Sequence, residues 1–128
     1  MNTLEYVAIE QVDAQSMILP AHMRHAHLEG ARLALLGRVK ENELPEEFVQ
    51  KALDAGDECH AIMDGNTLAS YGWYSKAPTA APQYVYMYKG FTSEAYRGQG
   101  LHTIGVMLAL NEYRDQGFKG VLLSPSAH

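Results

Sequence analysis

The chain has 128 residues, of which 47% are hydrophobic and 20% are charged, and this composition is typical of a globular protein with a single core. Ten basic side chains stand against fifteen acidic ones, which gives a formal net charge of −5, and the basic residues are spread along the chain. This distribution argues against a duplex nucleic acid or an anionic membrane surface as a partner.

Two further features of the sequence indicate a compartment. Cys59 is the single cysteine and has no partner for an internal disulfide, which fits a reducing environment. The N-terminal sequence MNTLEYVAIEQ lacks the regions of a signal peptide, and no apolar run reaches the ~18 residues that span a bilayer. We therefore expect a cytoplasmic protein with one domain over residues 1–128.

The first part of the chain predicts one strand followed by two helices. Residues 4–10 are rich in β-branched and aromatic side chains, which favours a strand. Apolar residues recur at helical spacing over residues 20–36, just before Gly37, and predict the first helix. A second helix is predicted from Pro45, which suits a first turn, to Gly56, which suits a helix end.

The pattern then changes to the period of strands. Residues 58–63 and 67–74 flank the sequence DGN, and an Asp-Gly pair between strand-like runs is a strong hairpin signal. The prolines of residues 76–82 indicate a loop, and residues 84–91, YVYMYKGF, read as a strand.

A glycine turn, a helix and a last strand complete the predicted order. The helix is expected from Leu101 to about Gly117, and the strand over residues 119–124. The order β-α-α-β-β-β-α-β predicts a mixed α/β fold in which the strands on either side of the last helix run parallel.

The sequence EAYRGQGLHTIG, residues 94–105, predicts an anion site. Backbone N–H groups at a helix N-terminus have no partner inside the helix, and the helix dipole adds partial positive charge there. The turn does not fit the ATP-type P-loop, which needs four residues between its glycines and a Lys before Ser or Thr. It does not fit the dinucleotide fingerprint either, because its glycines have the wrong spacing and follow a hairpin.

Residues 84–124 resemble motif A of the GNAT superfamily of acyl-CoA-dependent N-acyltransferases, in which a strand runs into a turn of the form Q/R-x-x-G-x-G/A and then a helix. The residues at these six positions are Ala95, Tyr96, Arg97, Gly98, Gln99 and Gly100. Arg97 stands directly before the first glycine, as in the frequent family variant YRGxG. The resemblance implies a mixed, mostly antiparallel sheet.

The chain departs from the family pattern at its C-terminal end. The chain ends without the usual C-terminal helix and closing strands, so we expect the domain to be incomplete there. An exposed last strand would leave an open sheet edge, and pairing between two copies would cover it. We therefore expect a homodimer.

A coenzyme site follows from the resemblance. The amides of the turn would bind the pyrophosphate of acetyl-CoA, with Gly98 and Gly100 allowing close approach, and the pantetheine arm would pair with the backbone of the motif strand. The expected coenzyme-binding residues are Phe91, Thr92, Arg97, Gly98, Gln99, Gly100, Leu101, His102 and Thr103. The thioester would lie where the motif strand and the last strand separate.

Three side chains are candidates for catalysis. Tyr86 and Tyr88 lie on the motif strand, where the family often places its base, and Tyr88 is nearest the expected separation. His60 on the preceding hairpin is the third candidate. Ordinary packing against the sheet is an open alternative for all three.

The histidine-rich sequence HMRHAH, residues 22–27, lies in the first predicted helix. A helix would place His22 and His25 on one face and His27 elsewhere, without a further ligand at suitable spacing. We interpret these histidines as a solvated face or a wall of the substrate pocket, and no metal is expected.

The predicted function is direct transfer of an acetyl or other short acyl group from acyl-CoA to an amine of a small molecule or peptide. The alternative is a catalytically inactive ligand-binding or subunit module with the same fold. The expected partners are acyl-CoA and the amine, with no nucleic acid and no membrane.

Overall fold

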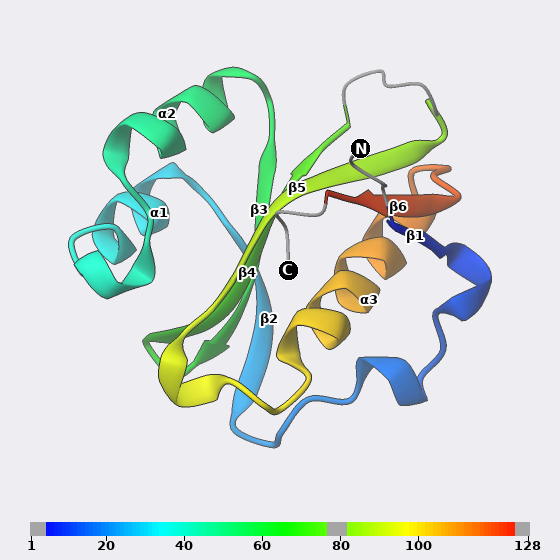
Figure 1. Cartoon of the computed structure of the whole chain (residues 1–128), viewed down its shortest axis with the longest axis horizontal. Helices are drawn as coiled ribbons and strands as arrows, with labels where there is room; N and C mark the ends of the chain where they lie inside the picture. Colours follow the sequence, from blue (N-terminus) through cyan, green and yellow to red (C-terminus); the bar gives the residue numbers. More distant parts are fainter. Residues whose placement is uncertain (1–4, 77–81, 125–128) are drawn as a thin grey trace.

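Six strands form one sheet in the computed structural model, which describes residues 5–76 and 82–124 (Figure 1). The strands lie in the order β1-β6-β5-β4-β3-β2. Their bounds are β1 Glu5–Ala8, β2 Met23–Leu28, β3 Glu58–Asp64, β4 Thr67–Ser75, β5 Tyr84–Thr92 and β6 Gly120–Leu123. Neighbouring strands are antiparallel except β5 and β6, which are parallel, so the predicted mixed, mostly antiparallel sheet and its parallel pair are confirmed.

Helices cover both faces of this sheet (Figure 1). Helices α1 (Gly30–Leu36) and α2 (Glu46–Asp54) lie on one face, and α3 (Leu101–Arg114) lies on the other. The remaining helical segments are the short 3-10 turns η1 Ile9–Gln11, η2 Gln15–Met17, η3 Lys40–Asn42 and η4 Glu94–Tyr96. Among the described residues, no helix combines the length and apolar character needed to cross a membrane.

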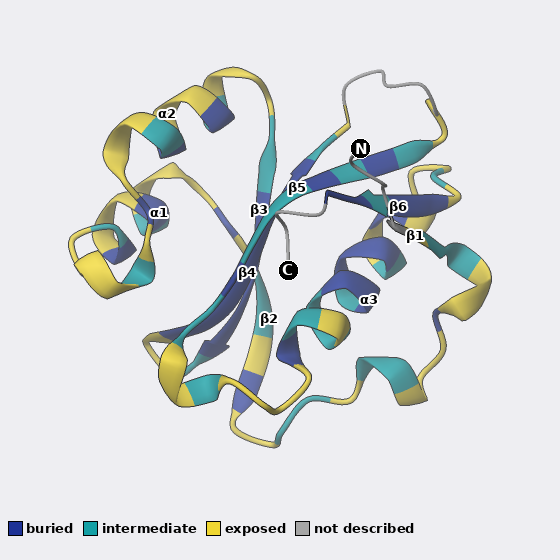
Figure 2. Ribbon diagram, viewed as in Figure 1, coloured by how far each residue is buried: buried dark blue, intermediate teal, exposed yellow. Residues whose placement is uncertain are grey.

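Each helical layer packs on its own cluster of buried side chains. Leu33 of α1 and Val49 of α2 pack with Trp73 of the sheet, whereas Leu110 of α3 packs with Val121 on the opposite face. Buried residues accordingly follow the inner sides of the helices and the middle of the sheet (Figure 2). Two separate apolar layers therefore hold the sheet between them.

The first half of the helix predicted over residues 20–36 is wrong, because residues 23–28 form the edge strand β2. Strand β2 pairs with β3 from Met23, opposite Asp64, to Leu28, opposite Cys59. Helical spacing of apolar residues is a local signal, and this long-range pairing overrides it. Only the part after Glu29 is helical, as α1.

The other predicted elements are present with shifts of a few residues. The first strand ends at Ala8, because η1 follows it, and the hairpin, α2, β5, α3 and β6 lie where the sequence indicates. The predicted loop over residues 76–82 falls largely on residues 77–81, which lie outside the described residues.

The expectation of an exposed last strand is also wrong, because β1 covers it. Strand β1 pairs antiparallel with β6, from Glu5 opposite Leu123 to Ala8 opposite Gly120. The two edges of the sheet are therefore β1 and β2. The approach is close at Gly120, where an added β-carbon would lie 2.5 Å from the carbonyl oxygen of Val7.

The space around Gly120 and Gly105 predicts opposite effects of Gly→Ala substitutions on stability. Gly120→Ala should lower the free energy of unfolding by about 1–3 kcal/mol, because backbone atoms must move apart. Gly105→Ala should raise it by up to ~1 kcal/mol, since Ala favours a helix and its β-carbon would lie at an ordinary 3.6 Å from Ile62. Urea unfolding of both variants measures the effects, and equal stability of Gly120→Ala and the wild type would contradict the close approach.

Candidate functional site

The turn between β5 and α3 contains two glycines in the left-handed conformation. Gly98 has φ 83° and Gly100 has φ 72°, values that side chains with a β-carbon rarely adopt. The first bond of α3 joins Ile104 N–H to the Gly100 carbonyl at 3.1 Å, so the amides before Ile104 are directed out of the helix end. An added β-carbon on either glycine would meet no atom within 4 Å, so their backbone faces open space.

Side-chain hydrogen bonds fix the turn to the sheet on both sides. Arg97 Nε donates to the carbonyl oxygen of Thr92 at 3.1 Å, which ties the turn to the end of β5. The Tyr96 hydroxyl donates to Asp64 Oδ2 at 2.7 Å, which ties it to the end of β3. The outward amides of α3 are thus held in a preformed position.

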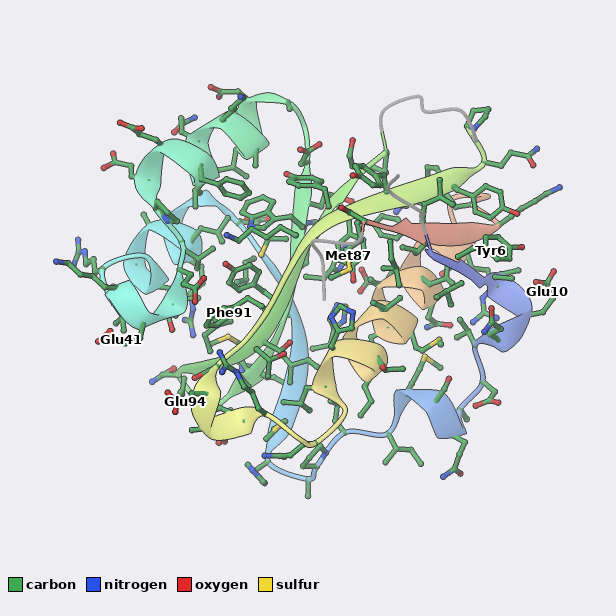
Figure 3. The ribbon with its side chains drawn as sticks, viewed as in Figure 1. Tyr6, Glu10, Glu41, Met87, Phe91 and Glu94 are labelled. Carbon is green, nitrogen blue, oxygen red and sulfur yellow. The ribbon has the colours of Figure 1, made fainter. Side chains whose placement is uncertain are left out.

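Two open grooves lie beside this turn, between the end of β5 and the segment that joins α1 to α2. One has a volume of about 380 Å³ and includes Thr92 and His102 in its wall. The other has a volume of about 630 Å³ and includes Glu41 and Glu94 (Figure 3). The residues that line both grooves are Glu43, Phe91 and Arg97.

Strand β5 has a half-paired edge next to the grooves. It pairs with β6 only from Tyr84, opposite Gly120, to Met87, opposite Leu123, and the Ser124 N–H then donates to the Met87 carbonyl at 3.0 Å. Beyond this point, no described strand pairs with residues 88–92 on that side. The two strands therefore separate near Met87, which Figure 3 labels in the middle of the sheet.

Glu43 is a groove residue that the sequence did not indicate. Its backbone is left-handed, with φ 52° and ψ 46°, which costs a residue with a β-carbon about 1–3 kcal/mol. The Tyr71 hydroxyl donates to the Glu43 carbonyl oxygen at 2.6 Å and holds this conformation. Because this partner is distant in the sequence, no local pattern reveals the role of Glu43.

Tyr86 and Tyr88 lie on one face of β5, with ring centroids 6.1 Å apart. The Tyr88 hydroxyl donates to Asp57 Oδ2 at 2.7 Å. Burial raises the pKa of Tyr88 above its ordinary value, and the hydrogen bond to Asp57 raises it further. Tyr88 thus keeps its proton near neutral pH, and this disfavours a role as a base.

His60 lies on the opposite face of the sheet, beneath α3. Its Nδ1 lies 3.0 Å from Nε2 of His25, and its Nε2 lies 3.0 Å from the hydroxyl oxygen of Tyr113. Burial lowers the pKa of His60 to about 3, and nearby His25 lowers it further, so the ring is neutral. The three candidates for catalysis therefore do not converge: Tyr88 packs against Phe48 of α2, whereas His60 packs against α3.

The expected coenzyme-binding residues, in contrast, all lie within one segment, residues 91–103. They run from the end of β5 through the turn into the first turn of α3, and Phe91, Thr92, Arg97 and His102 line the grooves.

A family model described as "Acetyltransferase (GNAT) family" matches residues 23–128. No curated protein sequence matches the chain.

Several solved structures share the fold. A GCN5-related N-acetyltransferase from Kribbella flavida has a TM-score of 0.65 at 15% identity, over 98% of this chain and 48% of its own. A tandem GNAT protein from the clavulanic acid biosynthesis pathway has a TM-score of 0.67 at 15% identity, over 98% and 44%. This chain thus spans about half the length of these two proteins. A predicted acetyltransferase from Clostridium acetobutylicum, solved with acetyl-CoA, has a TM-score of 0.56 at 16% identity, over 83% and 84%.

The lowered pKa of His60 predicts a pH-dependent stability. The unfolded chain binds a proton on this histidine below about pH 6.5, whereas the folded chain binds one only near pH 3, so the stabilisation is complete above 6.5 and is lost as the pH falls through this window. His60→Gln should remove up to about 1.4 kcal/mol per pH unit from the slope of unfolding free energy against pH. Urea unfolding at several pH values measures the slope, with the exposed His22→Gln as control. An unchanged slope in His60→Gln would contradict the assignment.

Proposed function

Because the chain belongs to the GNAT acetyltransferase family, we propose that it transfers an acetyl or other short acyl group from acyl-CoA to an amine of a small molecule or peptide. The observation that carries this proposal is the left-handed Gly98–Gly100 turn, which directs the first amides of α3 into open space beside the half-paired edge of β5. The turn suits the phosphate groups of the coenzyme. The half-paired edge of β5 suits its extended arm, which contains amide groups.

The turn would bind the pyrophosphate of the coenzyme. The amides of residues 98–102 and the positive end of the α3 dipole supply the attraction without a long basic side chain. The exposed guanidinium of Arg97 adds a positive charge at the same place. Gln99, Leu101 and Thr103 would then contribute through their position in the turn and the first turn of the helix.

The pantetheine arm would lie along residues 88–92, where its amides can pair with the backbone of Phe91 and Thr92. The thioester would then reach the point where β5 and β6 separate, close to Met87. The amine nitrogen attacks the thioester carbon, a C–N bond forms, the C–S bond breaks, and the thiolate takes up a proton while the amine loses one. A free backbone N–H of β5 is suited to stabilise the oxyanion that forms in between.

Glu43 is the side chain that we propose for contact with the acceptor. Glu43 lines both grooves together with Phe91. Glu41 and Glu94 add two further carboxylates to the larger groove. Such a wall favours a positively charged amine over a neutral or acidic acceptor. Glu43 would hold the ammonium group of the acceptor in these grooves before the proton is lost.

The alternative is a binding module that holds acyl-CoA without turning it over. It is favoured by the positions of the catalytic candidates, since Tyr88 keeps its proton beside Asp57 and His60 is buried on the other face. Calorimetric titration with acetyl-CoA, desulfo-CoA and ATP, followed by an assay of thiol release with a panel of amines, separates the two functions. Binding of both coenzymes but not ATP supports the site, and thiol release supports the enzyme.

Substitution of either turn glycine should abolish coenzyme binding. Gly98→Val and Gly100→Val place a branched side chain in the space that the pyrophosphate would occupy and disfavour the left-handed backbone. Gly65→Val is the matched control, because Gly65 is also left-handed, with φ 61°, but lies in the β3–β4 turn. Titration with acetyl-CoA should show wild-type affinity for the control only. Wild-type affinity in Gly98→Val and Gly100→Val would exclude the turn as the pyrophosphate site.

Glu43→Gln should weaken binding of the acceptor without affecting binding of the coenzyme. For a cationic amine, we expect KM to rise about tenfold, which corresponds to ~1.4 kcal/mol. The Kd for acetyl-CoA should stay unchanged, and Glu47→Gln on α2 serves as the control for a lost surface charge. An unchanged KM with a cationic amine would show that Glu43 does not contact the acceptor.

A further inference from the structure

Three potential metal ligands converge on the sheet face that α3 covers, away from the grooves. They are His25 of β2, His60 of β3 and Glu112 of α3, and each offers a ligand atom within 4.8 Å of the others. Nε2 of His25 lies 3.0 Å from Nδ1 of His60, and Glu112 Oε2 lies 3.7 Å from the same Nδ1.

We propose that His25, His60 and Glu112 bind a divalent transition-metal ion, with Zn²⁺ as its simplest representative. Two imidazoles and one carboxylate are a ligand set that such ions prefer. Two nitrogens bound to tetrahedral zinc at ~2.05 Å lie about 3.3 Å apart, close to the distance between the two histidine nitrogens. The Glu112 carboxylate, whose Oε2 lies 3.7 Å from Nδ1 of His60, would move closer to complete the set, and a fourth position is left for water.

The hydrogen bonds of His60 and Tyr113 fix which ring nitrogen of His60 carries the proton. The Tyr113 hydroxyl donates to Glu58 Oε1 at 2.8 Å, so its oxygen accepts from Nε2–H of His60 at 3.0 Å. The neutral ring therefore carries its proton on Nε2 and presents the lone pair of Nδ1 to His25 and Glu112. A histidine that binds a metal usually donates its other ring N–H to a hydrogen-bond acceptor in this way. Here the acceptor is the Tyr113 hydroxyl, which is itself bonded to the Glu58 carboxylate.

A second grouping, His27, Glu58 and His60, competes for the same histidine. It is the weaker site because Glu58 already accepts from Tyr113 and lies 3.6 Å from Nζ of Lys76. It would also need the His60 nitrogen that donates to Tyr113. The first grouping uses Nδ1, whose lone pair accepts only from Nε2–H of His25, a bond that a metal ion between the two rings would replace.

The two histidines of the site are shielded from solvent, whereas Glu112 is accessible. The side chain of His60 is 3% exposed and that of His25 is 16% exposed, whereas that of Glu112 is 48% exposed. An ion can therefore enter past the carboxylate and lose water on reaching the two imidazoles. Since the ligands come from an edge strand, an inner strand and a helix, the bound ion would link all three elements.

The test uses the full 128-residue chain without a histidine tag, stripped with a chelator and dialysed. Calorimetric titration with Zn²⁺ and the visible absorption of Co²⁺ report binding, and thermal unfolding reports stabilisation. We expect one equivalent of Zn²⁺ to bind, a tetrahedral-type Co²⁺ spectrum, and a rise of the Tm with Zn²⁺ concentration. Absence of binding to the folded wild type would overturn the proposal.

Variants locate the site. Glu112→Gln keeps the shape of a half-exposed side chain, and it should weaken Zn²⁺ binding by about tenfold or more, as should His25→Ala. Tyr113→Phe keeps the packed ring but removes the partner of His60 Nε2, and about a tenfold loss is expected here as well. His22→Ala and Glu47→Gln, which lie outside the cluster, should bind like the wild type. Equal affinity in Glu112→Gln, His25→Ala and the controls would also overturn the proposal.

Discussion

The incomplete pairing of β5 is the constraint on which the proposed chemistry depends. On one side β5 pairs with β4 from Tyr86, opposite Ser75, to Thr92, opposite Ser70. On the other side it pairs with β6 only as far as Met87. A sheet normally satisfies its backbone groups with another strand, so an interior strand that is half open offers an extended ligand a place in the ladder. The glycine turn follows directly on this open half, so one continuous segment can serve both the arm and the phosphates of a coenzyme.

The sheet also separates two chemically different regions. The grooves near α1 and α2 are lined by carboxylates and by the end of β5 and suit a cationic amine, whereas the glycine turn beside them suits the anionic phosphates of the coenzyme. The opposite face, beneath α3, holds a chain of hydrogen bonds from His25 through His60 and Tyr113 to Glu58. Because His60 is neutral and buried, the second region is suited to coordination or to rigidity rather than to proton transfer at the grooves.

Much of the fold and the coenzyme turn could be predicted from the sequence, because their signals are local. The DGN hairpin, the proline-led α2 and the Gly98–Gly100 turn each depend on residues within a few positions of one another. Strand β2, Glu43 and the histidine cluster depend on partners far away in the chain. The apolar residues around β2 have helical spacing, so the sequence predicts a helix there. The left-handed backbone of Glu43 depends on the hydrogen bond from Tyr71. His25 contacts His60 only because β2 pairs with β3.

The pairing of β1 with β6 has a consequence for how the chain folds. Residues of the first strand find their partners at almost the opposite end of the sequence, from Ala8 with Gly120 to Glu5 with Leu123. Closing so long a loop is entropically costly, and contacts of this kind slow folding. During synthesis, β1 leaves the ribosome first but must wait unpaired until β6 has been made. Until that moment β1 is open to pairing with other chains.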